Sequence, residues 1–489
     1  MPCGGADHPY HCPMTLSSHV EPARQTTTKR FASDEEIVAA VERVRDTFDS
    51  GATRALDWRE RELRQLERML VDNEPDLLEA LHSDLGRCRF EGVVAETGFL
   101  VNDIRHTLKQ LRGWAKPKRV KVPLAIHPAK AVIQPEPLGV ALIIAPWNYP
   151  LQLSVGPLIA AIAAGNTAVV KPSEIAPATS AILSKLLPRY LDSTAYAVIE
   201  GGVAETTKLL EQRFDHIFYT GNGSVGRVVM TAAAKHLTPV TLELGGKSPC
   251  IVDSEVDLDV AAKRIVWGKF FNAGQTCIAP DYLLLHESIA EQMFEKIKAT
   301  IREFYGNDPQ SSSDFARIVN ERHFDRLSKL LDSGKVVAGG TTDRTARYIA
   351  PTVLRDVDPD SPVMAEEIFG PILPCMTVAS VDDAIRFVTA RSKPLALYVF
   401  STNKATTDRV LSRTSSGGVC INDCVSHYAA PELPFGGVGE SGMGAYHGKA
   451  GFDTFTHQKS VLDKSTRVDP PLRYPPYGED QLKWVKRLM

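Results

Sequence analysis

Two residues of this chain have the types and the neighbours that covalent catalysis needs. Cys277 follows Asn272, Gly274 and Gln275, and Glu243 is followed closely by a pair of glycines. A thiol can attack an electrophilic carbon, and a carboxylate can then activate water as a general base. Each residue alone also has an ordinary interpretation, because most cysteines in proteins are small buried hydrophobic residues. The pair is therefore a candidate nucleophile and base whose roles depend on their surroundings.

A glycine-rich turn offers a place for a phosphate group. Gly221, Asn222 and Gly226 belong to the run GNGSVG, which fits the pattern G-x-G-x-x-G. The run follows a strand-like stretch at 217–219 and precedes a helix-like stretch at 225–234, which is the context that dinucleotide binding requires. Backbone N–H groups at the start of such a helix attract an anion. We therefore predict a dinucleotide site at this turn.

Glu243 has a second interpretation in such a site. It lies about twenty residues after the glycine turn, where a carboxylate commonly holds the adenosine ribose. Two observations oppose that role. The glycine turn follows a late strand of its unit, and Lys171 with Glu174, after an earlier strand, offers a cation and a carboxylate for a ribose. From the residues alone, Glu243 stays open between ribose ligand and general base.

The elements that must position these residues alternate between strands and helices. We expect strands at 140–144, 167–170, 195–199 and 217–219, with a helix of small residues at 153–164. Continuous apolar strands that alternate with helices predict a parallel sheet covered on both faces. Ligands gather at the carboxyl ends of such strands, where Asn148, Lys171 and Glu174 fall.

Helices precede this region and a second alternating region follows it. A capping box at 33–36 begins a helix that ends at Gly51, and amphipathic stretches at 58–81 and 90–114 extend the helical layer. From about residue 246 to 419 strands and helices alternate again, with a strand expected at 282–285 and a helix at 289–305. The chain therefore has two α/β regions behind a helical opening.

Bulk composition excludes several classes of protein. A chain of 489 residues exceeds one ordinary core, so two or three packed units are expected. The net charge of −3, without a basic stripe, gives no electrostatic reason to expect nucleic acid. No apolar stretch approaches the roughly 20 residues of a membrane span. The eight cysteines lack the spacing of a disulfide scaffold, which favours a reducing, cytoplasmic compartment.

The first 30 residues differ from the rest of the chain. They are rich in threonine, histidine, proline and glycine, and we expect a disordered extension. Cys3, His8, His11 and Cys12 within it could imitate half of a metal site. No second half is visible, so no metal is predicted.

Seven segments, in order, resemble the aldehyde dehydrogenase family. They are APWNYP at 145–150, VKPSE at 170–174, YTGNGSVG at 219–226, LELGGKSP at 242–249, NAGQTCI at 272–278, EEIFGP at 366–371 and PFGGVGESGMG at 434–444. The resemblance extends from about residue 31 to beyond 444. Within the family the chain is similar to the class 3 branch of fatty, aromatic and apocarotenal aldehyde dehydrogenases. NYP at 148–150, SGMGAYHGK at 441–449 and LRYPPY at 472–477 carry that second likeness.

The resemblance implies an α/β fold, with two open parallel α/β domains and a small oligomerisation arm. The dinucleotide-binding domain would comprise 31–115 and 139–245, and the catalytic domain 246–420. Arm segments would be 116–138 and 421–470, followed by a C-terminal tail at 471–489. The branch typically forms homodimers. The hydrophobic anchor of its membrane-bound members is absent here, so at most a peripheral membrane contact by the tail is expected.

The resemblance also implies catalytic roles. Cys277 would be the nucleophile, Asn148 with the backbone N–H of Cys277 the oxyanion hole, and Glu243 the base that activates water. From the residues alone, Asn148 could instead cap the helix that follows it. A variant that passes the acyl group to coenzyme A and a binding protein without turnover remain alternatives.

The cofactor implied is NAD, with NADP accepted less readily. Lys171 and Glu174 would hold the adenosine ribose, and Gly221, Asn222 and Gly226 the pyrophosphate. Glu367 would hold the nicotinamide ribose, although from the residues alone it could be a surface carboxylate. Phe369 would pack near the ring, and Trp147 completes the implied cofactor set. The substrate would be an apolar fatty, aromatic or terpenoid-like aldehyde.

Overall fold

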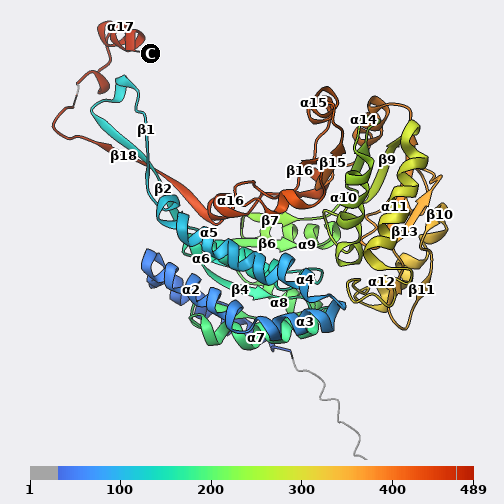
Figure 1. Cartoon of the computed structure of the whole chain (residues 1–489). Coiled ribbons are helices and arrows are strands. Elements are labelled where there is room, and N and C mark those ends of the chain that lie inside the picture. Colours follow the sequence, from blue (N-terminus) through green and yellow to red (C-terminus); the bar gives the residue numbers. More distant parts are fainter. Residues whose placement is uncertain (1–30, 470, 489) are drawn as a thin grey trace, which may run out of the picture. The chain divides into compact units, whose positions relative to one another are not determined.

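The structure, a computed structural model, describes residues 31–469 and 471–488 of the chain. The expected extension at 1–30, with its cysteines and histidines, lies outside the described residues. From Ala32 onward the chain forms one unit. This unit holds two large sheets and a three-stranded sheet (Figure 1).

The first large sheet has six strands in the order β17-β7-β6-β3-β4-β5. They are β3 (Val140–Ile144), β4 (Thr167–Lys171), β5 (Tyr196–Val198), β6 (His216–Thr220), β7 (Val240–Glu243) and β17 (Gly442–Met443). All neighbours are parallel except β17, which runs antiparallel to β7. The chain runs outward from β3 to β5 and returns to β6 on the other side of β3. Loops after β3 and β6 therefore diverge and leave a crevice at this switch point.

Strand β3 shows why this sheet is covered on both faces. All five of its residues are buried. Ala141 and Ile143 join one apolar cluster, whereas Val140, Leu142 and Ile144 join another, because successive side chains of a strand point to opposite faces. On the first side pack α2 (Leu56–Asp72), α3 (Glu74–Leu85), α5 (Gly98–Trp114), α6 (Gln152–Ala164) and α7 (Pro177–Tyr190). On the second pack α1 (Asp34–Asp49), α8 (Val203–Glu211) and α9 (Gly223–Ala234).

The second large sheet has seven strands in the order β10-β13-β14-β9-β8-β15-β16. They are β8 (Pro249–Val252), β9 (Tyr282–His286), β10 (Lys335–Ala338), β13 (Thr352–Arg355), β14 (Ile372–Val378), β15 (Ala396–Phe400) and β16 (Gly418–Ile421). Only β10 is antiparallel to its neighbour. The associated helices are α10 (Leu258–Phe270), α11 (Ala290–Tyr305), α12 (Glu321–Ser328), α13 (Pro362–Ala365), α14 (Val381–Thr389) and α15 (Lys404–Arg413). A two-stranded sheet joins β11 (Thr342–Asp343) to β12 (Tyr348–Ile349). The predicted pair of open, mainly parallel α/β sheets is confirmed.

The third sheet joins segments that are far apart in the sequence. It consists of β1 (Lys118–Val120), β2 (Ala129–Pro137) and β18 (Thr456–Lys464), all antiparallel (Figure 1). Of the expected arm segment 421–470, only the β18 part pairs with β2. The part before it returns to the first sheet, where β17 pairs with β7 and α16 (Gly448–Thr454) packs on α6. The domain boundaries themselves stay a prediction.

The helical opening differs in detail from the expectation. The capping box at Ser33 and Glu36 is confirmed. The stretch expected at 58–81 is divided into α2 and α3 at Asn73, where Pro75 stands in the first turn of α3. The stretch 90–114 contains α4 (Arg89–Gly92), a π-helical turn at Val93–Thr97 and then α5. Helix α17 (Glu479–Leu488) ends the described chain. Every helix in the described ranges is too short or too polar to span a bilayer.

Candidate active site

The candidate residues come from opposite ends of the strands in the two large sheets. Asn148 follows β3 and Glu243 ends β7, so both belong to the carboxyl edge of the first sheet. Cys277 precedes β9 and Glu367 precedes β14, so both belong to the amino edge of the second sheet. The rule that ligands gather at the carboxyl ends of parallel strands therefore locates Asn148 and Glu243, but not Cys277 and Glu367.

The chain before Cys277 makes an unusual left-handed turn. After α10, Asn272, Ala273 and Gly274 have φ values of 53°, 51° and 73°. Residues other than glycine rarely adopt this left-handed backbone region. A Cβ at Gly274 would collide with the carbonyl of Gly370. Buried hydrogen bonds must therefore hold the turn.

Gln275 supplies several of those hydrogen bonds. Its Nε2 donates to the carbonyls of Asn272 and Arg317 at 3.1 and 3.0 Å, and its Oε1 accepts from Val319 N at 3.0 Å. Tyr149 and Thr276 share a hydrogen bond of 2.6 Å between their hydroxyl groups. The backbone around Cys277 is therefore fixed from several sides.

Asn148 is tied to the cysteine turn through its side chain. Its Nδ2 donates to the carbonyl of Gln275 at 3.1 Å, and the residue is buried. The amide nitrogen carries two hydrogens, so one fixes the amide and the second is left for another acceptor. The N-cap residue of α6 is Leu151, which makes no side-chain cap hydrogen bond, so Asn148 does not serve as the cap.

Glu243 ends β7 with a buried carboxylate. Only 2% of the residue is exposed, and neither carboxylate oxygen has a hydrogen-bond partner among the described residues. Burial raises the pKa of this carboxyl group well above its usual value. A buried carboxylate of this kind is a strong base and needs a partner such as water or a substrate group.

The thiol of Cys277 shares this environment. Burial raises the pKa of the Cys277 thiol, and the carboxylates of Glu367 and Glu243 raise it further. Backbone N–H groups of Cys277 and Ile278 act in the opposite direction. The thiol of the protein alone is therefore protonated at neutral pH, and attack requires a base or a positive charge nearby.

A single cavity contains both groups. It encloses about 810 Å³, its open mouth included, and Cys277 and Glu243 both line it. Most other lining side chains are apolar or aromatic: Val94, Phe99, Leu153, Trp267, Phe271, Leu395, Val425, Tyr428, Phe435 and Tyr446. Such a lining favours an apolar ligand with one polar reacting group.

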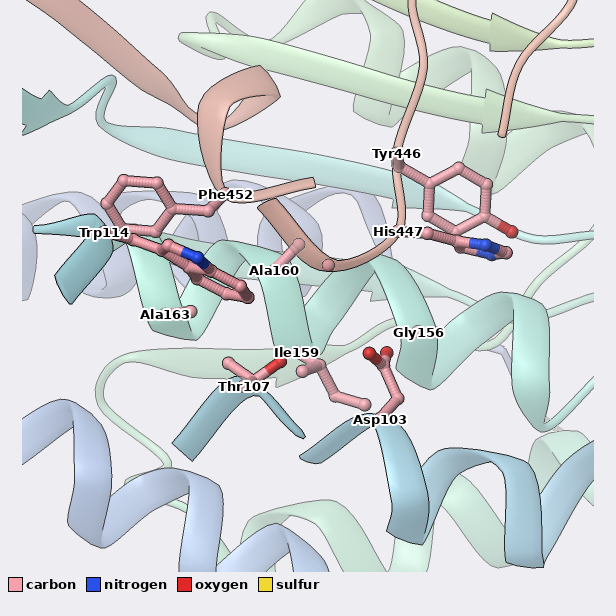
Figure 2. A pocket seen from close by; sticks show the side chains of 11 residues that line it. Asp103, Thr107, Trp114, Gly156, Ile159, Ala160, Ala163, Tyr446, His447 and Phe452 are labelled. Carbon is pink, nitrogen blue, oxygen red and sulfur yellow. The ribbon is translucent and has the colours of Figure 1, made fainter. Parts of the chain in front are cut away.

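A smaller cavity shares Tyr446 with the larger one. Figure 2 shows Asp103 on α5 pointing toward the segment that carries Tyr446 and His447, with Gly156 of α6 beside it. Burial raises the pKa of Asp103 to about 7 and lowers the pKa of His447 to about 3. Both groups are therefore largely uncharged at about pH 6.

Two charged residues after β4 form a pair at the carboxyl edge. Lys171 Nζ donates to Glu174 Oε2 at 2.8 Å. The lysine side chain is 5% exposed and the glutamate side chain 37% exposed. The lysine thus orients a carboxylate that solvent or a ligand hydroxyl can reach.

The glycine turn has the predicted strand–turn–helix context. It connects β6 to α9, and the Asn222 side chain caps α9 by accepting from Val225 N at 2.9 Å. A Cβ at Gly221 would collide with the Tyr219 hydroxyl, and one at Gly226 would approach Leu244 at 3.0 Å. The turn therefore requires glycine, and it presents the positive end of a helix.

The third group of candidate cofactor residues lies before β14. The Glu367 carboxylate lies against Gly245 and accepts the N–H of Gly246, while burial raises its pKa to about 8. Phe369, with φ of 51°, meets the Trp147 ring edge-on at 5.3 Å. An amide-rich helix start, two carboxylates for ribose hydroxyls and a pair of rings fit a dinucleotide.

Other residues shape the site without a recognisable local pattern. Lys247 binds Asp281 and the carbonyls of Val363 and Glu366, which holds the segment before Glu367. Arg87 and Glu96 are fully buried beside Asn148. In sequence these charges sit in helical or polar stretches and resemble solvent-facing residues, so only packing reveals them.

No cluster of three or more potential metal ligands occurs in residues 31–469 and 471–488. The groups that the site does bring together are a thiol, a carboxylate and amides, beside the residues that fit a dinucleotide.

Comparison with known proteins agrees with this geometry. The model of the aldehyde dehydrogenase family matches residues 14–461. Aldehyde dehydrogenase family 3 member A2 of Rattus norvegicus is 53% identical over 448 residues, covering 91% of this chain and 93% of that protein. The dimeric NADP-preferring aldehyde dehydrogenase of Mus musculus is 52% identical over 442 residues, covering 90% and 98%. A substrate-bound structure of Staphylococcus aureus AldH superposes with a TM-score of 0.90 at 47% identity, covering 92% and 99%. With this fold and these matches across most of its length, the chain belongs to the aldehyde dehydrogenase family and is an NAD(P)-dependent aldehyde dehydrogenase.

Proposed function

We propose that this enzyme oxidises an apolar fatty, aromatic or terpenoid-like aldehyde to its carboxylic acid. The reaction runs through a thiohemiacetal and a thioester on Cys277, which water activated by Glu243 then hydrolyses. The main support is that Cys277 and Glu243 line the same largely apolar cavity. Burial of an apolar chain there contributes about 25 cal/mol per Å² of surface removed from water.

In the first step the Cys277 thiolate attacks the aldehyde carbon. The resulting oxyanion accepts the second N–H of Asn148 Nδ2 and the backbone N–H of Cys277. The Asn148 amide is pre-oriented, because its first N–H is bound to the Gln275 carbonyl. Loss of one such donor typically costs about 3 kcal/mol of activation free energy.

A nicotinamide held by the cofactor residues would accept the hydride that leaves the thiohemiacetal carbon. Loss of that hydride leaves a thioester on Cys277. Glu243 then removes a proton from water, and the water oxygen attacks the thioester carbon. The tetrahedral adduct then collapses as its C–S bond breaks, which regenerates the Cys277 thiolate and releases the carboxylic acid. One aldehyde, one water and one oxidised cofactor thus give one acid, one reduced cofactor and a proton.

We assign the cofactor residues as follows. Gly221, Asn222 and Gly226 bind the pyrophosphate at the start of α9, and Lys171 with Glu174 binds the adenosine ribose. Glu367 binds the nicotinamide ribose, with Phe369 and Trp147 packing near the ring.

NAD is favoured over NADP. The Glu174 carboxylate accepts from a ribose hydroxyl and repels a 2′-phosphate. The Lys171 amine, which pairs with it at 2.8 Å, reduces that repulsion, so NADP is accepted less well rather than excluded.

The acylating alternative, transfer of the thioester to coenzyme A, is less well supported. Glu243 lies in the same cavity as Cys277 with both carboxylate oxygens unpartnered among the described residues, which suits a base for water. A binding protein without turnover would have no use for that costly buried carboxylate.

We also propose a cytoplasmic homodimer with a peripheral membrane contact. The six cysteines within the described ranges are free thiols, which suits a reducing compartment. Helix α17 exposes Leu482, Trp484 and Val485 beside lysine and arginine residues, as interfacial helices do. The mouse relative is named dimeric.

The proposal is tested by NADH formation across a panel of aldehydes of increasing chain length, with NAD and with NADP. Cys277→Ala is expected to abolish turnover. Glu243→Gln is expected to give one rapid equivalent of NADH and then stall, because the thioester forms but is not hydrolysed. Trapping that acyl-enzyme by mass spectrometry identifies its site.

The matched control is Cys420→Ala, which removes a half-buried thiol that does not line the cavity. It should retain wild-type turnover. Residual turnover in Cys277→Ala, or steady turnover in Glu243→Gln, contradicts the thioester mechanism. If coenzyme A restores steady turnover to the stalled Glu243→Gln variant, the acylating alternative is indicated.

A further inference from the structure

The loop that carries Asn148 is anchored by a buried ion pair. Arg87 follows α3, and Glu96 lies in the π-helical turn Val93–Thr97. Their side chains are 0% exposed; Arg87 Nη1 binds Glu96 Oε1, and Nη2 donates to the Asn148 carbonyl. The guanidinium also lies 4.7 Å from the centre of the Tyr149 ring. The Arg87 side chain therefore contacts two consecutive residues of the loop after β3, Asn148 and Tyr149.

Glu96 extends this anchor to helix α6. Its Oε2 accepts the backbone N–H groups of Leu151 and Gln152 at 2.8 and 2.9 Å. Leu151 is the N-cap residue of α6 and Gln152 is its first residue, and the N-cap side chain makes no capping hydrogen bond. Glu96 thus acts as a capping anion at the positive end of the helix, supplied from a distant segment.

The Asn148 carbonyl is also held by the turn that precedes Cys277. Asn272 Nδ2 donates to the Asn148 carbonyl at 3.0 Å and to the Gln275 carbonyl at 3.1 Å. The Gln275 carbonyl in turn accepts Asn148 Nδ2. Asn148, Asn272 and Gln275 thus form a closed ring of hydrogen bonds that links the loop after β3 to the turn before Cys277, and Arg87 adds a second donor at its Asn148 carbonyl.

Stability alone is a poor explanation for such a pair. Two charges taken out of water incur a large desolvation penalty, and apolar or neutral replacements often stabilise a fold as well. A serine or asparagine before α6 would cap that helix more simply. What the ion pair adds is a rigid guanidinium, with Nη1 bound to Glu96 and Nη2 held at the Asn148 carbonyl.

We propose that Arg87 and Glu96 are positioning residues for the oxyanion site. They fix the peptide plane of Asn148, so that the free N–H of its side chain and the N–H of Cys277 converge on one oxygen. This inference rests on the proposed thioester mechanism. The π-helical turn also supplies Val94 and Ala95 to the cavity wall, so one turn of chain sets both the wall and the oxyanion donor.

The test compares Arg87→Lys with Arg59→Lys. A lysine keeps the charge but cannot donate to Glu96 and the carbonyl with fork geometry. Arg59 is a matched control because it is 6% exposed and donates to the carbonyls of Thr53 and Ala163, near the other end of α6. The readout is the single equivalent of NADH that each variant forms in a Glu243→Gln background, with aldehyde in excess over enzyme.

The rate constant and the amplitude of that turnover report different things. Loss of correctly folded enzyme lowers the amplitude, whereas misplacement of the oxyanion donor lowers the rate constant. Displacement by about 1 Å can cost as much as a hundredfold. We expect Arg87→Lys to lower the rate constant 10- to 100-fold with KM for NAD within twofold, and Arg59→Lys to leave the rate constant unchanged.

Glu96→Gln provides an independent variant that keeps the shape of the side chain. We expect a three- to tenfold lower rate constant, and no further loss when it is combined with Arg87→Lys, because both act through one contact. An unchanged rate constant in Arg87→Lys overturns the proposal. If Arg87→Lys does not fold, an unchanged rate constant in Glu96→Gln overturns it. Failure of the thioester mechanism would appear separately, as turnover in Cys277→Ala.

Discussion

At the scale of single residues, the site concentrates acidic groups where charge is costly. Cys277, Glu243 and Glu367 all have pKa values raised by burial, and the two carboxylates further raise that of the thiol. A raised pKa makes a carboxylate a stronger base but makes a thiol a poorer nucleophile at neutral pH. The resting enzyme therefore keeps its thiol protonated. The positively charged nicotinamide ring of a bound oxidised cofactor would favour the thiolate.

The influence of Glu367 on the thiol gives a prediction with a defined pH window. The Glu367 pKa is about 8, so its charge is present above that pH and lost below it. At pH 9, Glu367→Gln removes a negative charge near Cys277 and should lower the thiol pKa. We expect alkylation of Cys277 by iodoacetamide, without cofactor, to become about three- to tenfold faster, since the rate follows the thiolate fraction.

Glu366→Gln is the control for this experiment, because the neighbouring side chain is exposed. Intact-mass measurement of alkylation between pH 7 and pH 10 gives both profiles. The Glu367→Gln and wild-type profiles should converge at pH 6.5 to 7, where Glu367 is protonated. An unchanged rate at pH 9 would show that its carboxylate does not act on the thiol.

At the scale of elements, short turns rather than long helices define the site. The left-handed turn at 272–274, the turn between β6 and α9 and the π-helical turn at 93–97 each place side chains that regular structure would aim elsewhere. Each is held by packing or hydrogen bonds from a different segment of the chain. Substitutions in these turns should therefore affect function more than helix substitutions of the same size.

Gly221 in the β6–α9 turn allows a matched comparison. A Cβ there collides with the Tyr219 hydroxyl, whereas nothing lies within 4 Å of a Cβ at Gly113 of α5. We expect Gly221→Ala to lower the free energy of unfolding by about 1–3 kcal/mol and to raise KM for NAD several-fold. Gly113→Ala should be neutral or stabilising by up to about 1 kcal/mol. Urea unfolding and initial-rate kinetics measure both effects; equal behaviour of the two variants would contradict the steric argument.

At the scale of the whole molecule, the three-stranded sheet is the least covered of the sheets in the described residues. All three residues of β1 are exposed, β2 has no fully buried residue, and β18 has one. A sheet with so little buried surface has little stability of its own. A second subunit that packs on it would supply the missing burial, which supports the proposed homodimer.

Leu462 in β18 provides a test of that assembly. The residue is 53% exposed and pairs in register with Ala131 of β2. A buried, unpaired charge at an interface is costly, so Leu462→Glu should weaken the dimer at least tenfold. Val336→Glu is the control, because Val336 is 50% exposed on β10 of a different sheet. Sedimentation velocity measures both; a dimer unaffected by Leu462→Glu would place the interface elsewhere.

Local sequence determined much of the fold and part of the site. Apolar runs such as 140–144 predicted buried parallel strands, because a strand covered on both faces needs apolar residues at every position. The G-x-G-x-x-G pattern predicted a strand, a tight turn and a helix, and the structure has this arrangement, with Gly221 where a Cβ would collide with Tyr219. These features depend on neighbours in the sequence, so they could be inferred without a structure.

Tertiary structure decided what those residues meet. From spacing alone, Glu243 could have held a ribose; its buried carboxylate instead lies in the cavity with Cys277, while Glu174 pairs with Lys171 at another strand end. Arg87 and Glu96 look like solvent-facing charges in sequence, yet both are fully buried beside Asn148. The physical reason is that burial depends on segments distant in the sequence, such as the Asn148 carbonyl that Arg87 meets 61 residues further along the chain, and no local pattern specifies such contacts.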